Sequence, residues 1–438
     1  MKSLTLLQTL KLSGQLVTQI SSLARKPYMS RKQIEAYQLE RLKLILDVAK
    51  KNVSHYQQKN LLDPSRINSL EDWQQLPVLT KQDLLNLDVP DRINRNFKTE
   101  DLIVSKSSGS TGKALDVFYD EDSYNFFILA GLRLYFMVFK YLPWHKQTYI
   151  YTSPYPLKSL FGAYPLNFIS TLNPIDDTID KLKKNPPDLL VCYPSHLRAI
   201  AAQLTEEDLK IIRPKAINVN SEMSSQAERN YLEKVFKCFV FDDYSSEELT
   251  RIASQCRNYS YHIFEDLNYI EILDDNMKPV KDGVVGNIVG TNLHNIGMPL
   301  IRYMQGDRGA IVSKKCECGR NFKILETLEG RKNDAFTLST GEVISSGFLL
   351  DLTYGVFLNY PNSVSAFCLI QEEHDNWTIE LVPGEKWDEK LKTLIPEKLS
   401  ADLKKSNVTI RSKVVSEVRK TKSGKANPII SDLKKENK

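Results

Sequence analysis

The sequence lacks the features of secreted, membrane-spanning and disordered chains. Its 438 residues include only six cysteines, without the dense spacing of a disulfide scaffold, so we expect reduced thiols and a cytoplasmic protein. The most apolar internal segment, residues 126–142, contains Arg133 and Lys140 and is shorter than a bilayer span, which favours a buried helix. A hydrophobic fraction of 42% and a charged fraction of 26% are typical of a globular protein.

The chain also lacks a strong charge imbalance. Its formal net charge is +5, and its densest basic runs, residues 181–184 and 419–425, are short. We therefore expect no nucleic-acid partner. Length alone predicts two or three domains.

The first 26 residues resemble a signal peptide only weakly. Lys11, Ser13 and Gly14 interrupt the apolar stretch, and no small-residue cleavage pattern follows. An amphipathic helix is expected instead, packed on the body of the protein or lying at a membrane surface, with packing favoured.

A run of glycine, serine and threonine, residues 106–113, ends in Lys113 and lies between two strand-like segments. Glycines let backbone N–H groups turn toward a phosphate, and hydroxyls with a lysine add donors, so the run is a candidate anion-binding loop or an ordinary Gly/Ser-rich connection. Gly109 and Gly112 enclose only two residues and Ala114 follows the lysine, so the spacing excludes a Walker A loop.

Alternating strand-like and helix-like segments follow this loop and predict an α/β fold with a largely parallel sheet flanked by helices. A long helix is expected over 31–58, and two capping boxes begin at Ser69 and Thr80. The predicted alternating segments are 148–151, 175–183, 189–192, 196–204, 216–219, 227–236 and 238–241, and hairpins are expected over 262–312. A smaller α+β unit is predicted from Arg331, with elements at 347–358, 364–371, 378–382, 387–403 and 408–415.

Five stretches stand in an order that resembles the core motifs of the adenylate-forming superfamily of acyl-CoA synthetases, adenylation domains and luciferases. They are SSGSTGK (107–113), DDYSSEE (242–248), GMPLIRYMQGD (297–307), EGRKND (329–334) and KTKSGK (420–425). LPVLTKQDL, HIFEDLNYIEILDD and CECGR are most similar to the phenylacetate-CoA ligase branch and its capsular-polysaccharide-associated relatives. The resemblance implies an N-terminal AMP-binding domain, 1–330, with a helical preamble, 1–100, and a small mobile C-terminal domain, 331–438.

The resemblance also implies roles for individual residues. Catalytic roles fall to Lys113, Glu247 and Lys425, and Glu247 would support Mg²⁺. Nucleotide contacts fall to Ser107, Ser108, Gly109, Ser110, Thr111, Gly112, Ser221, Glu222, Asp243, Tyr244, Ser245, Asp307 and Arg331. Taken singly, each residue has a structural alternative, such as Asp307 capping a turn or Lys425 being a solvated charge.

The activity implied is ATP-dependent activation of a carboxylic acid as an acyl-adenylate, followed by acyl transfer to a thiol such as CoA. The segment AFTLSTGEVISSGFL, residues 335–349, departs from the family pattern, which leaves open an amine or hydroxyl acceptor in surface polysaccharide synthesis. The alternative to an enzyme is an inactive protein that binds a nucleotide and acts as a scaffold. The expected partners are therefore a small carboxylate, ATP and an acyl acceptor.

Four residues around the predicted hairpins are candidate zinc ligands. Cys256 and His262 lie before the RYMQGD element, and Cys316 and Cys318 lie after it, so folding could gather them as a Cys3His site. The resemblance to the phenylacetate-CoA ligase branch also implies a structural zinc here, since some members of that branch carry one near this place. The alternative is a set of free thiols beside a hydrogen-bonded histidine, and Cys192, Cys238 and Cys368 are expected in the core.

Overall fold

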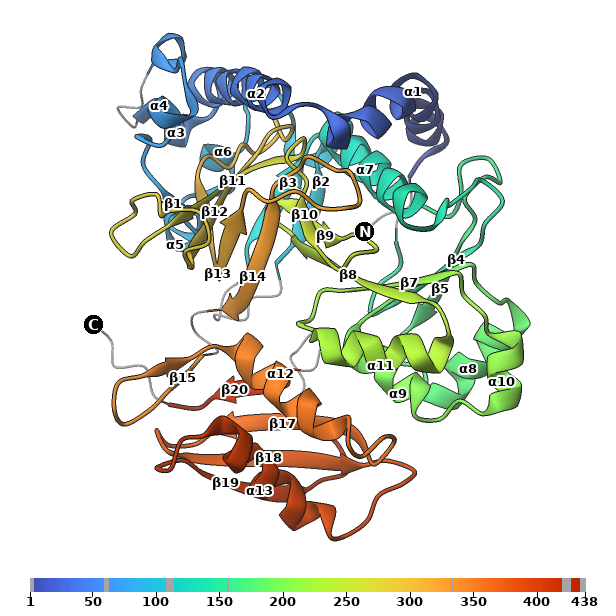
Figure 1. Ribbon diagram of the computed structural model, residues 1–438. Coiled ribbons are helices and arrows are strands. Elements are labelled where there is room, and N and C mark those ends of the chain that lie inside the picture. Colours follow the sequence, from blue (N-terminus) through green and yellow to red (C-terminus); the bar gives the residue numbers. More distant parts are fainter. Residues whose placement is uncertain are drawn as a thin grey trace. The chain divides into compact units, whose positions relative to one another are not determined.

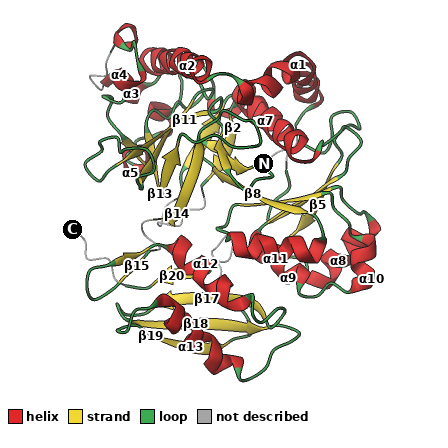
Figure 2. Ribbon diagram, viewed as in Figure 1, coloured by secondary structure: helices red, strands yellow, loops and turns green. Residues whose placement is uncertain are grey.

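The computed structural model describes residues 4–58, 63–107, 114–155, 157–331, 335–419 and 427–433, and it confirms the α/β fold class (Figures 1 and 2). The chain forms two compact units. Unit 1 comprises Met1–Trp144, Tyr155–Tyr164 and Asp243–Leu328, and unit 2 comprises His145–Pro154, Pro165–Asp242 and Glu329–Lys438.

Helices form the first part of unit 1, as the sequence predicted. They are α1 (Leu6–Arg25), α2 (Arg31–Asn52), α3 (Ser54–Gln58), α4 (Leu70–Trp73), α5 (Lys81–Leu85), α6 (Val89–Arg92) and α7 (Glu121–Phe139), with short 3-10 turns η1 (Lys26–Tyr28), η2 (Pro64–Arg66) and η3 (Thr99–Asp101). The capping boxes at Ser69 and Thr80 are confirmed. The single helix expected over 31–58 is wrong in one respect, because Val53 takes an extended conformation and separates α2 from α3.

The sheet of unit 1 is mainly antiparallel. Its strands follow the order β11 (Asn268–Leu273), β12 (Gly286–Asn292), β13 (Tyr303–Val312), β14 (Ile324–Arg331), β10 (Tyr261–Ile263), β9 (Thr250–Gln255) and β8 (Phe239–Ser246), and β1 (Leu79–Thr80) pairs in parallel with β13. A separate hairpin consists of β2 (Ile103–Lys106) and β3 (Asp116–Tyr119). The hairpins predicted between 262 and 312 are thereby confirmed.

Helix α7 is the buried helix predicted near residues 126–142, although it begins earlier, where Asp120 accepts a hydrogen bond from the Ser123 N–H. The buried Arg133 side chain on this helix forms two hydrogen bonds to Asp266, with N–O distances of 2.5 and 3.0 Å, and donates to the Leu23 carbonyl of α1. The pairing explains how an arginine is tolerated in an apolar helix. No helix in the described part of the chain is long and apolar enough to cross a membrane.

The first part of unit 2 contains the predicted parallel strands. The ladders β4·β5, β4·β6 and β6·β7 are all parallel. The strands are β4 (Gln147–Tyr151), β5 (Leu166–Ser170), β6 (Leu189–Cys192) and β7 (Ala216–Asn220), and the helices are α8 (Ile175–Lys184), α9 (Pro194–Ala201), α10 (Glu206–Ile211) and α11 (Gln226–Phe236). Strand β5 was not predicted from the sequence.

The C-terminal part of unit 2 is the predicted α+β assembly. Its sheet follows the order β19 (Thr409–Val414), β18 (Asn376–Pro383), β17 (Val364–Gln371) and β20 (Ile429–Ser431), with helices α12 (Ser346–Phe357) and α13 (Leu391–Leu403) and a small ladder of β15 (Phe336–Thr337) and β16 (Val343–Ile344). The last strand, β20, pairs in parallel with β17, and Arg419 forms a 2.9 Å ion pair with Asp432.

The two units do not follow the predicted boundary at residue 330. Unit 2 joins residues 329–438 to 165–242. Within it, the buried Tyr354 of α12 donates a 2.5 Å hydrogen bond to Glu228 of α11. The division into domains 1–330 and 331–438 stays a prediction.

Candidate active site

The glycine-rich run begins at the tip of the β2–β3 hairpin, where the sequence predicted a loop between strands. Lys106 faces Asp116 in the hairpin ladder. One residue further, the Ser107 N–H donates to the Leu115 carbonyl at 2.9 Å, and the Leu115 N–H donates to Ser107 Oγ at 2.8 Å. These bonds extend the pairing of the hairpin to Ser107 and Leu115. Ser108, Gly109, Ser110, Thr111, Gly112 and Lys113 themselves lie outside the described residues.

Glu247 is the exposed residue of the turn between β8 and β9, and both strands of the β2–β3 hairpin contact this turn. Ser105 of β2 donates to the Glu247 carboxylate, and Tyr119 of β3 donates to the Glu247 backbone carbonyl. The carboxylate is therefore held beside the base of the glycine-rich run.

Two ionisable side chains that the sequence reading missed lie at the same place. Lys81 Nζ, on the first residue of α5, donates to Ser107 Oγ at 3.3 Å. Glu248 is buried and accepts from the Tyr303 hydroxyl at 3.1 Å. Burial raises the pKa of the Glu248 carboxyl, and the positive charge of Lys81 opposes that rise. One feature of the sequence could have identified Lys81: it directly follows Thr80, the N-cap of α5, and so begins that helix.

Tyr244 and Asp307, both assigned to the nucleotide by the resemblance, lie together in unit 1. The Tyr244 hydroxyl donates to Asp307 Oδ2 at 2.6 Å and accepts from Gln305 Nε2 at 2.6 Å. Tyr244 comes from β8, while Gln305 and Asp307 come from β13. The arrangement places a half-buried carboxylate beside an aromatic ring, two groups that can accept from ribose hydroxyls and stack on a base.

Asp243 has a different environment from its neighbour. It is buried, and its carboxylate pairs with Arg251, whose guanidinium lies over the rings of Phe127 and Tyr135. The ion pair joins β8 to β9, and the ring contacts of Arg251 extend the link to α7, so the Asp243 side chain is occupied inside unit 1. Ser245 is half-buried on the same strand.

In unit 2 the carboxyl ends of β4, β6 and β7 bring three polar segments together, one of which carries the predicted nucleotide contacts Ser221 and Glu222. Tyr151 ends β4, Tyr193 follows β6, and Ser221 follows β7 with a positive φ of 66°. The Tyr151 hydroxyl lies 3.5 Å from Ser221 Oγ, and Glu222 accepts from the Ser195 N–H at 3.2 Å. Parallel strands end at one edge of a sheet, which explains this gathering.

Two other predicted residues are placed only partly or not at all. Arg331 is the last residue of β14, and its side chain lies outside the described residues. Lys425 also lies outside them, between Arg419 and Asn427.

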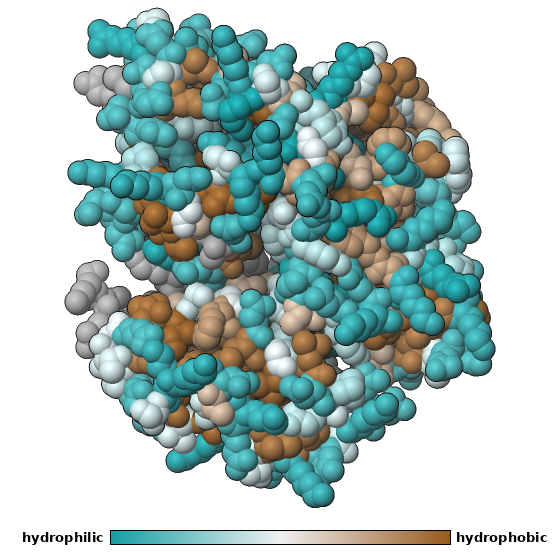
Figure 3. Space-filling model, in the orientation of Figure 1, coloured by the Kyte–Doolittle hydropathy of each residue, from teal (hydrophilic) through white to brown (hydrophobic). Residues whose placement is uncertain are grey.

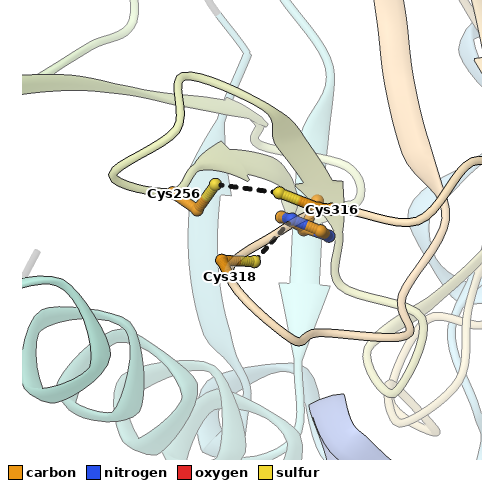
Figure 4. A group of neighbouring side chains, drawn as sticks. Cys256, Cys316 and Cys318 are labelled. Carbon is orange, nitrogen blue, oxygen red and sulfur yellow. Dashed lines mark hydrogen bonds between the residues drawn. The ribbon is translucent and has the colours of Figure 1, made fainter.

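The structure brings together all four candidate zinc ligands. The ligand atoms of Cys256, His262, Cys316 and Cys318 lie within 4.8 Å of one another. Cys256 Sγ lies 3.7 Å from Cys316 Sγ, and Cys318 Sγ lies 3.1 Å from His262 Nε2 (Figure 4). Strands β9 and β10 position the first pair of residues, and the loop between β13 and β14 carries the second.

The chemistry of this cluster fits a zinc ion. Tetrahedral zinc with Zn–S bonds of about 2.3 Å separates two sulfurs by roughly 3.8 Å, and the Cys256–Cys316 distance is 3.7 Å. His262 Nδ1 lies 3.0 Å from the Phe322 carbonyl, so a proton on Nδ1 leaves the Nε2 lone pair directed at the cysteines. Of the other cysteines, Cys192 and Cys368 are buried as expected, and Cys238 is half-buried.

Comparisons with known proteins identify relatives of this chain. A family model described as the CapK C-terminal domain matches residues 336–432. Phenylacetate-coenzyme A ligase of Thermus thermophilus is 24% identical over 332 residues, covering 70% of this chain and 72% of the relative. Protein CapK of Staphylococcus aureus is 25% identical over 425 residues, covering 91% of this chain and 89% of the relative.

A solved structure has the same fold. The crystal structure of 2-hydroxyisobutyryl-CoA ligase, in the postadenylation state in complex with R3-HIB-AMP, has a TM-score of 0.77 and 18% sequence identity, covering 93% of this chain and 92% of that one.

Proposed function

We propose that this chain is a member of the phenylacetate-CoA ligase-like branch of the adenylate-forming enzymes, and that it activates a carboxylic acid with ATP, releases pyrophosphate and passes the acyl group to a thiol such as CoA. A carboxylate oxygen attacks the α-phosphorus, and the bond to the bridging oxygen of pyrophosphate breaks. The acceptor then attacks the acyl carbon, and AMP leaves.

The observation that carries the proposal is the arrangement at the base of the glycine-rich run. Ser105 and Ser107 of one hairpin hold, respectively, the Glu247 carboxylate and the Lys81 ammonium. An anionic and a cationic group at the mouth of an anion-binding loop suit a nucleotide that carries both phosphates and a divalent cation. Glu247 would hold Mg²⁺, which when bound neutralises phosphate charge.

The remaining proposed roles concern contacts with the nucleotide and the acyl group. Residues 107–113 would grip the leaving pyrophosphate, Asp307 would accept from the ribose hydroxyls, and Tyr244 would stack on adenine. Ser221 and Glu222 would line the nucleotide or acyl pocket. Arg331 would make a second ribose or phosphate contact, and Lys425 would bridge carboxylate and phosphate oxygens during adenylation.

Lys113→Ala is expected to slow acyl-adenylate formation by about 10- to 100-fold, because one positive charge at the leaving pyrophosphate is lost. Acyl transfer from a supplied acyl-adenylate should keep its rate, since that step releases no pyrophosphate. Single-turnover measurements of both half-reactions check this. An equal loss in both would contradict the role of Lys113.

A second candidate acceptor is an amine or hydroxyl used in surface polysaccharide synthesis. The similarity to Protein CapK extends over 91% of this chain, against 70% for the Thermus ligase, and the C-terminal family match covers residues 336–432. That region includes most of the segment that departs from the family pattern. Formation of a sugar amide or ester, with no thioester when CoA is supplied, would favour this acceptor.

The first experiment is exchange of labelled pyrophosphate into ATP with a panel of aryl, fatty and hydroxy acids. Exchange with one acid class supports adenylation and names the substrate. If the protein binds nucleotide but no acid supports pyrophosphate exchange, the result would instead support an inactive scaffold. Release of ADP rather than AMP would overturn the proposal.

We also propose that the Cys3His cluster holds a structural zinc ion, because four ligands of suitable type leave no open position for chemistry. Cys316→Ser is expected to remove the metal and destabilise the protein by about 2 kcal/mol. Elemental analysis and thermal melts check this, with Cys238→Ser as control, since Cys238 lies outside the cluster. Purified protein without about one zinc per chain would contradict it.

A further inference from the structure

Helix α1 has two apolar faces, and only one of them is covered. Leu12 and Leu23 are buried in the core of unit 1. Leu6, Leu10 and Val17 are 69%, 52% and 79% exposed, and Leu7 and Ile20 extend the exposed set. Positions 6, 10 and 17 follow one stripe of a helix. Brown atoms gather at the upper right of Figure 3, where Figure 1 shows α1.

Three hydroxyl side chains near this stripe are already hydrogen-bonded within α1. The hydroxyls of Thr9, Ser13 and Thr18 donate to the helix's own carbonyls four residues earlier, at 2.8 to 2.9 Å. A hydroxyl already bonded within its helix is less costly to move out of water than one that is not. The exposed side of α1 is thus suited to an apolar surrounding.

The charged side chains of residues 1–34 are all basic. This segment contains no Asp or Glu, and its charged residues are Lys2, Lys11, Arg25, Lys26, Arg31 and Lys32. Lys11 is paired with Asp122 at the start of α7, at 2.9 Å, and this pair secures α1 to unit 1. Arg25 and Lys32 are exposed and flank Tyr28, which is 51% exposed. Cations beside a tyrosine are typical of a protein segment at a lipid headgroup layer.

We propose that α1 is a membrane-docking helix, which lays the stripe Leu6, Leu10 and Val17 into the surface of an anionic bilayer with Arg25 and Lys32 at the headgroups. We favour an anionic bilayer over a protein partner because the segment around α1 is basic and its charge complements that of anionic lipid. A stable dimer usually buries roughly 800 Å² on each partner, which is large beside one stripe of a single helix. The inference is independent of the catalytic proposal, because it needs no substrate.

The test is co-sedimentation of the full chain with vesicles of phosphatidylglycerol and phosphatidylethanolamine, compared with phosphatidylcholine vesicles. We expect binding to the anionic vesicles. The double variant Leu10→Ser/Val17→Ser should weaken that binding roughly 100-fold, because two apolar side chains no longer leave water. Arg25→Gln/Lys32→Gln should weaken it about 30-fold at low salt.

The matched control is Leu172→Ser/Val343→Ser, since these side chains are 80% and 62% exposed in unit 2. It should bind like the wild type, and thermal melts show whether every variant folds. Absence of wild-type binding overturns the proposal, and so does equal binding by the Leu10/Val17 variant. Dimerisation of the wild type that this variant abolishes, without vesicle binding, would assign the stripe to a second copy of the chain.

Discussion

Glu247→Gln is expected to lower the rate of acyl-adenylate formation by about 100- to 1000-fold. The substitution keeps the shape of the side chain and removes its charge. Its amide oxygen can still accept from Ser105, and the Tyr119 hydroxyl donates to the backbone carbonyls of Glu247 and Glu248, which the substitution leaves in place. The loss should therefore be chemical and not structural, with a melting temperature close to that of the wild type. Pyrophosphate exchange at saturating ATP measures it.

Titration with Mg²⁺ separates this role from a general effect of charge. If Glu247 supports the cation, the variant should need a higher Mg²⁺ concentration for half-maximal exchange. Glu100→Gln is the matched control, because Glu100 is exposed and precedes β2 in the same unit. An unchanged Mg²⁺ dependence in the Glu247 variant, together with full activity, would sink the proposed assignment.

Asp266→Ala is expected to destabilise the protein by about 3–5 kcal/mol, because it leaves Arg133 buried without its partner. Both side chains of this pair are 2% exposed, and Arg133 also donates to α1 at Leu23. Urea unfolding measures the change. Asp47→Ala is the control, since Asp47 pairs with Lys51 in an exposed i,i+4 pair and should matter by less than about 1 kcal/mol.

The pH dependence of this difference has a definite sign. Burial acts to raise the pKa of Asp266, but the charge and hydrogen bonds of Arg133 outweigh burial and lower it. A group whose pKa is lower in the folded state stabilises the fold above its unfolded pKa, about 3.9 for Asp. The wild type's advantage should be constant above about pH 5 and shrink as the pH falls below 4. An advantage that grows on acidification would contradict the pairing.

Most elements of the fold could be predicted because their signals are local. Residues 189–192 and 364–371 were predicted as strands with the bounds that β6 and β17 have. Strand β5 (LNFIS) was missed since its apolar residues do not alternate cleanly, and its pairing with β4 supplies the stability. Strand β20 has three residues and depends on β17 in the same way. Such strands are set by distant partners.

Candidate-site residues were accessible to sequence reasoning where they stand in ordered motifs. Tyr244 and Asp307 come from two motifs and meet at a 2.6 Å hydrogen bond. Gln305 and Glu248 were missed although they lie in the same motifs, because nothing in the sequence distinguishes a side chain that supports another from one that faces solvent. Their contacts depend on strand register, which the order of motifs does not specify.

Strand β20 covers the edge of β17 that would otherwise end the C-terminal sheet of unit 2. The Leu369 N–H donates to the Pro428 carbonyl at 2.8 Å, and the parallel ladder continues from the Leu369–Ile429 pair to the Gln371–Ser431 pair. An unpaired strand edge is a template for pairing with another chain. The three residues of β20 therefore protect β17 from edge-to-edge association with a second copy of the protein.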